Sequence, residues 1–110
     1  MLKVIADSDV VITTAAVPGK RAPCIISTVM VEEMKHGAVI IDLAAESGGN
    51  CELTKPGENV VVDGVTIMGP LNLASDTPTH ASQMYAKNIT TFLLALMKEG
   101  QLNLDLADEI

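Results

Sequence analysis

The sequence contains few aromatic residues and few cations. Its 110 residues include one tyrosine, one phenylalanine and no tryptophan, and the formal net charge is −7. Proteins that bind nucleic acid need a basic face for the phosphates, and single-strand binders add aromatic side chains on which bases stack. Both features are missing, so the composition excludes nucleic acid as a partner.

Long apolar runs and cysteine pairs are also scarce. No apolar run approaches the ~18 residues that a membrane span requires, and Asp7 interrupts the first residues before a signal-like stretch forms. The sequence therefore predicts a soluble chain. Cys24 and Cys51 form neither a disulfide framework nor a zinc motif with His36 and His80, so no metal site is predicted. Reduced thiols in a cytoplasmic protein are expected instead.

The most informative stretch covers residues 38–50. It begins with a short, continuous apolar run, which is the pattern of a strand buried on both faces. It continues with Asp42, Glu46 and the pair Gly48–Gly49, which permits a sharp turn or close contact with a ligand. In open α/β sheets, ligands bind beyond the carboxyl ends of the strands. We therefore expect a functional loop here; an ordinary turn after a strand is the alternative, and Asp42 fits either role.

Residues 9–14 form a second β-branched, apolar run that predicts a buried strand. Residues 15–23 follow it, and their prolines and glycine predict an ordered loop. Ser27 is placed to cap a helix over residues 28–36, with Gly37 as its stop. Strand, helix and strand in this order predict a βαβ unit.

The next runs, residues 60–62 and 65–68, flank Asp63–Gly64, a strong signal for a two-residue hairpin turn. The second run fits a further parallel strand as an alternative. Residues 75–78 are expected to be an irregular connection. Thr79 then predicts the start of a helix over residues 80–99, closed by Gly100.

This predicted helix has a broad apolar face that indicates packing rather than cofactor contact. Its members are Met84, Tyr85, Ile89, Phe92, Leu93, Leu96 and Met97. The chain contains no Gly-x-Gly-x-x-Gly turn for a pyrophosphate, no acidic residue placed to hold the ribose and no arrangement typical of covalent catalysis. The residues themselves therefore predict an α/β half-domain without catalytic residues of its own.

Several loops resemble one family. Residues 12–23 (ITTAAVPGKRAP) resemble a loop shared by alanine dehydrogenases and the alpha subunit of proton-translocating NAD(P) transhydrogenase, and residues 41–51 (IDLAAESGGNC) are similar to the next loop of that subunit. The likeness continues through residues 69–73 and 80–88. Alanine dehydrogenases usually carry Asp where Glu46 stands, so the transhydrogenase branch is favoured. Alanine dehydrogenase is the alternative, and a truncated, catalytically inert interaction fragment is the third interpretation.

The resemblance implies a partial Rossmann-like parallel sheet with a β-hairpin and a long C-terminal helix. Residues 1–78 correspond to the C-terminal portion of an NAD-binding domain. Residues 79–100 correspond to the helix that packs toward a second domain absent from this chain, and residues 101–110 to an acidic tail. The chain is thus expected to be a fragment, with the glycine fingerprint in the missing N-terminal part of the same subunit.

The resemblance also implies a cofactor and partners. NAD is the expected cofactor, with NADP on a partner component, and hydride passes from NADH to NADP⁺. The membrane and NADP-binding components are the implied partners, at the cytoplasmic face of the inner membrane, and a homo-oligomer is expected. At Ala16 the family tends to have Leu, and Glu46 is expected to bind. The implied cofactor-binding residues are Ala15, Ala16, Leu43, Ala44, Ala45, Glu46, Asn72 and Leu73.

Overall fold

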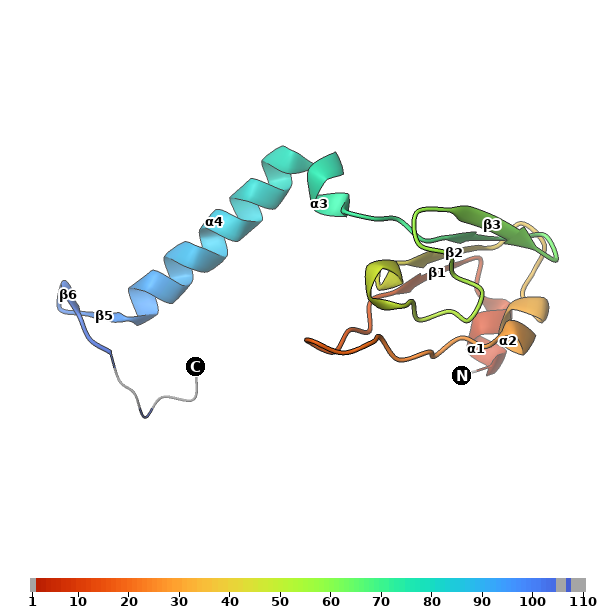
Figure 1. Cartoon of the computed structure of the whole chain (residues 1–110), viewed down its shortest axis with the longest axis horizontal. Coiled ribbons are helices and arrows are strands. Elements are labelled where there is room, and N and C mark those ends of the chain that lie inside the picture. Colours follow the sequence, from red (N-terminus) through yellow and green to blue (C-terminus); the bar gives the residue numbers. More distant parts are fainter. Residues whose placement is uncertain (1, 105–106, 108–110) are drawn as a thin grey trace. The chain divides into compact units, whose positions relative to one another are not determined.

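The computed structural model describes residues 2–104 and 107, and the chain divides into two units, Met1–Leu71 and Asn72–Ile110. Figure 1 labels the helices and strands of each unit. Of the predicted acidic tail, residues 105–106 and 108–110 lie outside the described residues. Each unit has its own set of helices and strands.

The first unit is built on a four-stranded sheet with the order β1-β2-β4-β3. The strands are β1 (Val10–Thr13), β2 (Val39–Asp42), β3 (Asn59–Val62) and β4 (Val65–Met68). β1 pairs parallel to β2 and β2 parallel to β4, whereas β3 and β4 are antiparallel. The run 65–68 therefore does both things that its pattern allowed. It closes the hairpin and joins the main sheet, and the predicted α/β fold is confirmed.

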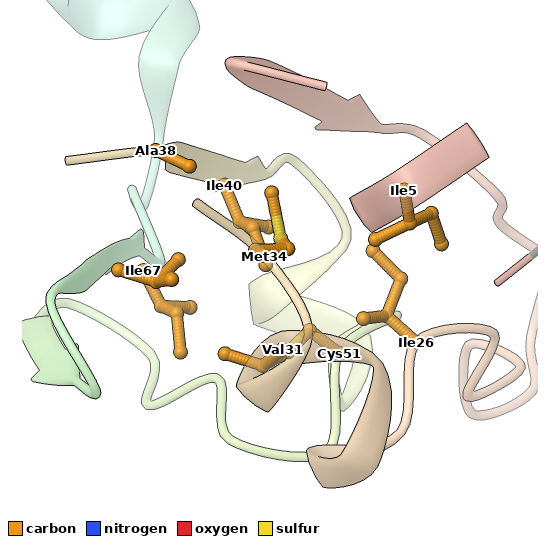
Figure 2. Packing of buried hydrophobic residues seen from close by; sticks show 9 residues of the cluster. Ile5, Ile26, Val31, Met34, Ala38, Ile40, Cys51 and Ile67 are labelled. Carbon is orange, nitrogen blue, oxygen red and sulfur yellow. The ribbon is translucent and has the colours of Figure 1, made fainter. Parts of the chain in front are cut away.

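One face of the sheet carries the core. Alternate residues share a face of a strand, and the register places Val11, Ile40 and Ile67 on neighbouring positions of the same face. Helices α1 (Leu2–Asp7) and α2 (Thr28–Glu32) contribute to this core. Figure 2 shows the resulting cluster around Ile40 and Ile67. The buried members of the cluster are Ile5, Ile26, Val31, Met34, Ala38, Ile40, Cys51, Val65 and Ile67.

The opposite face of the sheet is only partly covered. Val10 and Ile12 are 58% and 60% exposed, and their partners Val39 and Ile41 are half-buried. The prediction that residues 38–41 form a strand buried on both faces is therefore wrong for the described chain. Both helices of this unit supply side chains to the core face, which leaves the other face without such a layer.

Helix α2 differs from its prediction in length and in capping. It ends at Glu32 rather than near residue 36, and Ser27 makes no side-chain capping bond. The Glu52 carboxylate takes that place, because its Oε2 accepts bonds from the Thr28 N–H (2.9 Å) and the Thr28 hydroxyl (2.9 Å). These two bonds lower the pKa of Glu52. Gly37, at φ +88°, lies in a later turn whose N–H bonds to the Gly64 carbonyl (2.7 Å).

The second unit contains α3 (Leu73–Asp76), α4 (Pro78–Ala95), β5 (Met97–Lys98) and β6 (Gln101–Leu102). The predicted irregular connection at 75–78 is wrong, since part of it is helical. Thr77 rather than Thr79 precedes α4, and Pro78 occupies the start of the helix, where its missing N–H costs nothing. Glu99 and Gly100, at φ +52° and +80°, form the turn between β5 and β6. Gly100 therefore does not end the helix as predicted.

None of the helices formed by the described residues has the length and apolar character to cross a membrane. Within the second unit, the predicted apolar face of α4 lies largely in solvent. Met84 and Tyr85 are 70% and 69% exposed, and Phe92 is 50% exposed. No residue of α4 is buried in the described chain, so this helix presents apolar surface that its own unit does not cover.

Candidate functional site

The three parallel strands β1, β2 and β4 end at the same edge of the sheet. The loops after β1 and β2 are joined there, because the Leu43 N–H donates to the Thr13 carbonyl (2.9 Å). The loop after β4 leaves from the same edge and leads to Asn72, which belongs to the second unit. The predicted convergence of the three connectors at one sheet edge is confirmed.

The loop after β2 is organised by a buried carboxylate, Asp42, which is 0% exposed. We call the group around it the Asp42 clasp. Its Oδ1 accepts bonds from the Thr13 hydroxyl (3.0 Å) and the Ala44 N–H (3.0 Å). Its Oδ2 accepts bonds from the Asn50 N–H (2.7 Å), the Cys51 N–H (3.1 Å) and the Thr54 hydroxyl (2.7 Å). Of the two roles open to Asp42, the structure assigns the structural one.

These bonds also decide the charge of Asp42. Burial raises the pKa of this carboxyl, but the bonds from Thr54, Cys51, Asn50 and Ala44 outweigh it, and the pKa lies below its ordinary value. Donors aimed at a carboxylate stabilise the ionised form. Among the described residues, no buried side-chain nitrogen or oxygen lacks a hydrogen-bond partner. The clasp is therefore a fully satisfied, negatively charged anchor beneath the loop.

Gly49 allows the clasp to close. A Cβ at this position would lie 3.0 Å from Asp42 Oδ2 and 3.1 Å from Thr54 Cβ, and its φ is +76°. The predicted Gly48–Gly49 pair therefore meets both conditions that favour glycine: a left-handed backbone and a close approach. The neighbour that approaches Gly49 is the protein's own carboxylate.

Asn50 joins the loops after β1 and β2, and the sequence pattern did not single it out. The Ala15 N–H donates to Asn50 Oδ1 (2.9 Å), and Asn50 Nδ2 donates to the Ala15 carbonyl (2.8 Å) and the Pro23 carbonyl (2.8 Å). Asn50 is completely buried. An amide directly after a Gly–Gly pair was the available signal, but its partners lie 27 and 35 residues away.

The predicted cofactor-binding residues of these two loops differ in accessibility. Ala16 and Glu46 are exposed, Leu43 is 41% exposed and Ala15 is half-buried. Glu46 lies in a short 3-10 helix, η1 (Ala45–Ser47).

Ala44 and Ala45 are buried instead, and the Ala44 carbonyl accepts bonds from the Ser47 and Gly49 N–H groups. Ala44 therefore shapes the turn that presents Leu43 and Glu46. Asn72, at φ +51°, and Leu73, which is 41% exposed, lie in the second unit. All eight assignments remain predictions.

A groove of about 450 Å³ lies beside the clasp, but none of the predicted cofactor-binding residues lines it. Its lining includes Cys24, which is exposed, and Cys51, which is buried. Burial raises the pKa of the Cys51 thiol, so this thiol stays protonated near neutral pH. Over residues 2–104 and 107, no three metal-ligating side chains form a cluster.

A mostly parallel sheet whose loops collect at the carboxyl edge defines the class: Rossmann-like α/β nucleotide-binding domains. Within that class, the family model described as alanine dehydrogenase/PNT, C-terminal domain, matches residues 1–110. The chain belongs to this family.

Both branches of the family are represented among its relatives. The chain is 50% identical over 93 residues to an NAD(P) transhydrogenase alpha subunit of Rhodospirillum rubrum, covering 84% of this chain and 24% of that protein. It is 32% identical over 100 residues to alanine dehydrogenase of Halomonas elongata, covering 87% and 27%. A transhydrogenase structure from Sinorhizobium meliloti superposes with a TM-score of 0.76 at 44% identity, covering 98% of this chain and 30% of that one. The chain thus spans about a quarter of the length of these curated relatives.

Proposed function

We propose that the chain is part of the NAD(H)-binding component of an NAD(P) transhydrogenase. In this role it takes part in direct hydride transfer between NADH and NADP⁺ held on a separate component, coupled to proton translocation. The nicotinamide cofactors carry this chemistry, and the protein supplies binding and orientation. The chain's own contribution is one wall of the NAD(H) site, formed by Ala15, Ala16 and Leu43–Glu46, with Asn72–Leu73 from the following connector.

The observation that supports this most directly is the parallel pairing of β1, β2 and β4, since it gives their connectors a common edge. Leu43 and Glu46 are accessible at that edge, and the Asp42 clasp fixes the turn between them. Neither His36 nor His80 lies in these connectors. Hydride transfer between two nicotinamides requires no proton-abstracting base in this component, so the arrangement suits it.

Alanine dehydrogenation is the second candidate function, supported by the relative from Halomonas elongata. It needs an acid–base pair beside the substrate, because protons move along with the hydride. Glu46 is the acidic side chain that the described loops offer for such a role. The higher identity to the transhydrogenase relative, 50% against 32%, favours the first candidate.

The open surfaces of the first unit support a further polypeptide segment as partner. β1 is an edge strand of the described sheet, and Val10 and Ile12 project from its uncovered face. Exposed edges and apolar sheet faces are normally paired or covered. We propose that the remaining part of the same subunit covers them and supplies the phosphate-binding glycines, and that the assembly docks at the cytoplasmic face of a membrane component.

The test is a hybrid subunit in which this chain replaces the matching segment of the Rhodospirillum rubrum protein. We expect the hybrid to bind NADH and, with the other components of that complex, to reduce NADP⁺ from NADH. Glu46→Gln should weaken NADH binding in the hybrid, whereas Glu58→Gln, an exposed residue outside the connectors, should not.

Two results would overturn the proposal. Turnover of pyruvate and ammonia with NADH by the hybrid would assign it to the alanine dehydrogenase branch. Low-micromolar NADH binding by the 110-residue chain alone would contradict the need for a phosphate cradle from another segment. A hybrid that folds but binds no NADH would leave the chain as an interaction piece.

A further inference from the structure

The side chain of Asn50 continues the pairing of β1 beyond the point where the sheet ends. The ladder between β1 and β2 stops at Thr13 and Asp42. Two residues later, both backbone groups of Ala15 bond to the Asn50 carboxamide, at 2.9 Å and 2.8 Å. A carboxamide offers an acceptor and donors side by side, as a backbone amide does. Asn50 therefore replaces a neighbouring strand for one residue.

The same carboxamide closes the loop that follows β1. Asn50 Nδ2 also donates to the Pro23 carbonyl at 2.8 Å, so Ala15 and Pro23 share one amide group. Between them, residues 16–21 are exposed. The two ends of an exposed loop are thus held together by a single buried side chain, and their separation depends on it.

Asn50 is in turn held in place from the other side. Its N–H donates to Asp42 Oδ2 (2.7 Å), and its carbonyl accepts bonds from the Ile25 and Ile26 N–H groups (2.8 and 2.9 Å). Asp42 also binds the Thr13 hydroxyl at the end of β1 (3.0 Å). The position of the carboxamide is therefore fixed relative to both strands before any ligand arrives.

We propose that Asn50 is a positioning residue for NAD(H), acting through Ala15 on the loop that carries Ala16. This inference rests on the proposed function. A loop held in its bound conformation loses less conformational entropy when a ligand binds than a loop that must first be ordered. Asn50 itself is fully buried, so its effect on the nucleotide passes through the backbone of Ala15.

Asn50→Asp is the test variant, because it keeps the size and the Oδ1 acceptor but removes the donors to the Ala15 and Pro23 carbonyls. The matched control is Asn59→Asp, which introduces the same charge at an exposed position of the same unit. Amide hydrogen exchange on the 110-residue chain reports the loop without any cofactor. We expect a protected Ala15 amide in the wild type, and faster exchange of residues 15–23 in Asn50→Asp but not in Asn59→Asp.

The second measurement uses the hybrid subunit. We expect Asn50→Asp to raise the KM for NADH about tenfold, as for two lost hydrogen bonds, with kcat changed less than about twofold. A merely structural role predicts less folded enzyme, which lowers kcat and leaves KM unchanged. If the wild-type hybrid binds no NADH, the proposed function fails. If it binds NADH and Asn50→Asp binds equally well, the positioning role is wrong while the function stands.

The exchange experiment remains decisive if Asn50→Asp does not fold. A wild-type Ala15 amide that exchanges as fast as the exposed residues of its loop would show that the carboxamide does not hold the loop, and would overturn the inference. Protection at Ala15 together with a tenfold KM effect supports it.

Discussion

The two units of the chain differ in what they bury. The first unit buries a cluster of apolar side chains against one face of its sheet and satisfies a buried carboxylate with five hydrogen bonds. In the second unit, no described residue of α3, α4, β5 or β6 is buried. Isolated helices are marginal in water, and most helical stability comes from packing an apolar face. The first unit thus contains much of what its own fold needs, whereas α4 requires a surface from elsewhere.

The comparison is tested most severely at Asp42. In Asp42→Asn one carboxylate oxygen becomes an NH₂ group, so two or three of the five donors lose their acceptor. Each buried donor left without a partner costs about 1–3 kcal/mol, so we expect a loss of roughly 3–6 kcal/mol. This is comparable to the whole stability of a small domain. Urea unfolding followed by circular dichroism measures it.

The control for Asp42→Asn is Asp63→Asn in the hairpin turn. Asp63 is exposed and has a φ of +47°, a conformation that asparagine also tolerates. Its unfolding free energy should stay within about 0.5 kcal/mol of the wild type. Equal losses in the two variants would contradict the central role of the clasp.

Gly49→Ala is expected to have the next largest effect, because it adds a methyl group against the clasp. Gly49 and Gly19 both have a left-handed backbone, at φ +76° and +68°, but only Gly49 has atoms within 4 Å of the added Cβ. Gly19→Ala should lose about 1–2 kcal/mol for the backbone strain alone. Gly49→Ala should lose about 1–3 kcal/mol more from overpacking. The difference between the two unfolding free energies isolates the contact with Asp42 and Thr54, and a difference of zero would refute it.

The charge of Asp42 makes the first unit sensitive to acid. Its pKa in the folded state lies below the ordinary value of 3.8. A group with a lowered folded pKa stabilises the protein above its unfolded pKa, and this contribution is lost as the pH falls through the folded pKa. We therefore expect the unfolding free energy to decrease as the pH drops below about 4. In Asp42→Asn this decrease should be smaller, and an unchanged acid dependence would show that other carboxylates cause it.

Glu52 provides the comparison for this pH experiment. Bonds from the Thr28 N–H and hydroxyl lower its pKa as well, but the carboxylate is exposed. Glu52→Gln should therefore remove less of the acid dependence than Asp42→Asn does. Measuring both variants from pH 7 to pH 3 separates the buried carboxylate from the exposed one.

The sequence predicted the strands and the hairpin because these depend on neighbouring residues. β-Branched runs specify β1 and β2, and Asp63–Gly64 adopts the positive φ values that its turn requires. The caps and the clasp could not be predicted, because their partners are distant. The acceptor for Thr28 lies 24 residues away on Glu52, and the partner of Ala15 lies 35 residues away on Asn50. Such contacts appear only once the sheet brings the loops together.

The end of α4 illustrates a second reason for failure. Its apolar periodicity continues past Ala95, so the pattern extends the predicted helix to Glu99, and Gly100 is a plausible stop. The left-handed conformation of both Glu99 and Gly100 instead permits a two-residue turn between β5 and β6. A glycine that fits two local structures does not by itself choose between them.

The smallest effect on the chain is expected on the apolar face of α4, and it shows most directly that the two units differ. Phe92 is 50% exposed, so Phe92→Ser should change the unfolding free energy of the 110-residue chain by less than about 0.5 kcal/mol. In the hybrid subunit, where we propose that this face packs toward a second domain, the same change should cost about 3–5 kcal/mol. Leu94→Ser is the control, because Leu94 is 63% exposed and the helical period places it on the opposite side from Ile89 and Phe92. It should be tolerated in both contexts. Equal stability of the two variants in the hybrid would mean that the face of α4 carrying Phe92 has no partner there, and that its apolar side chains serve another purpose.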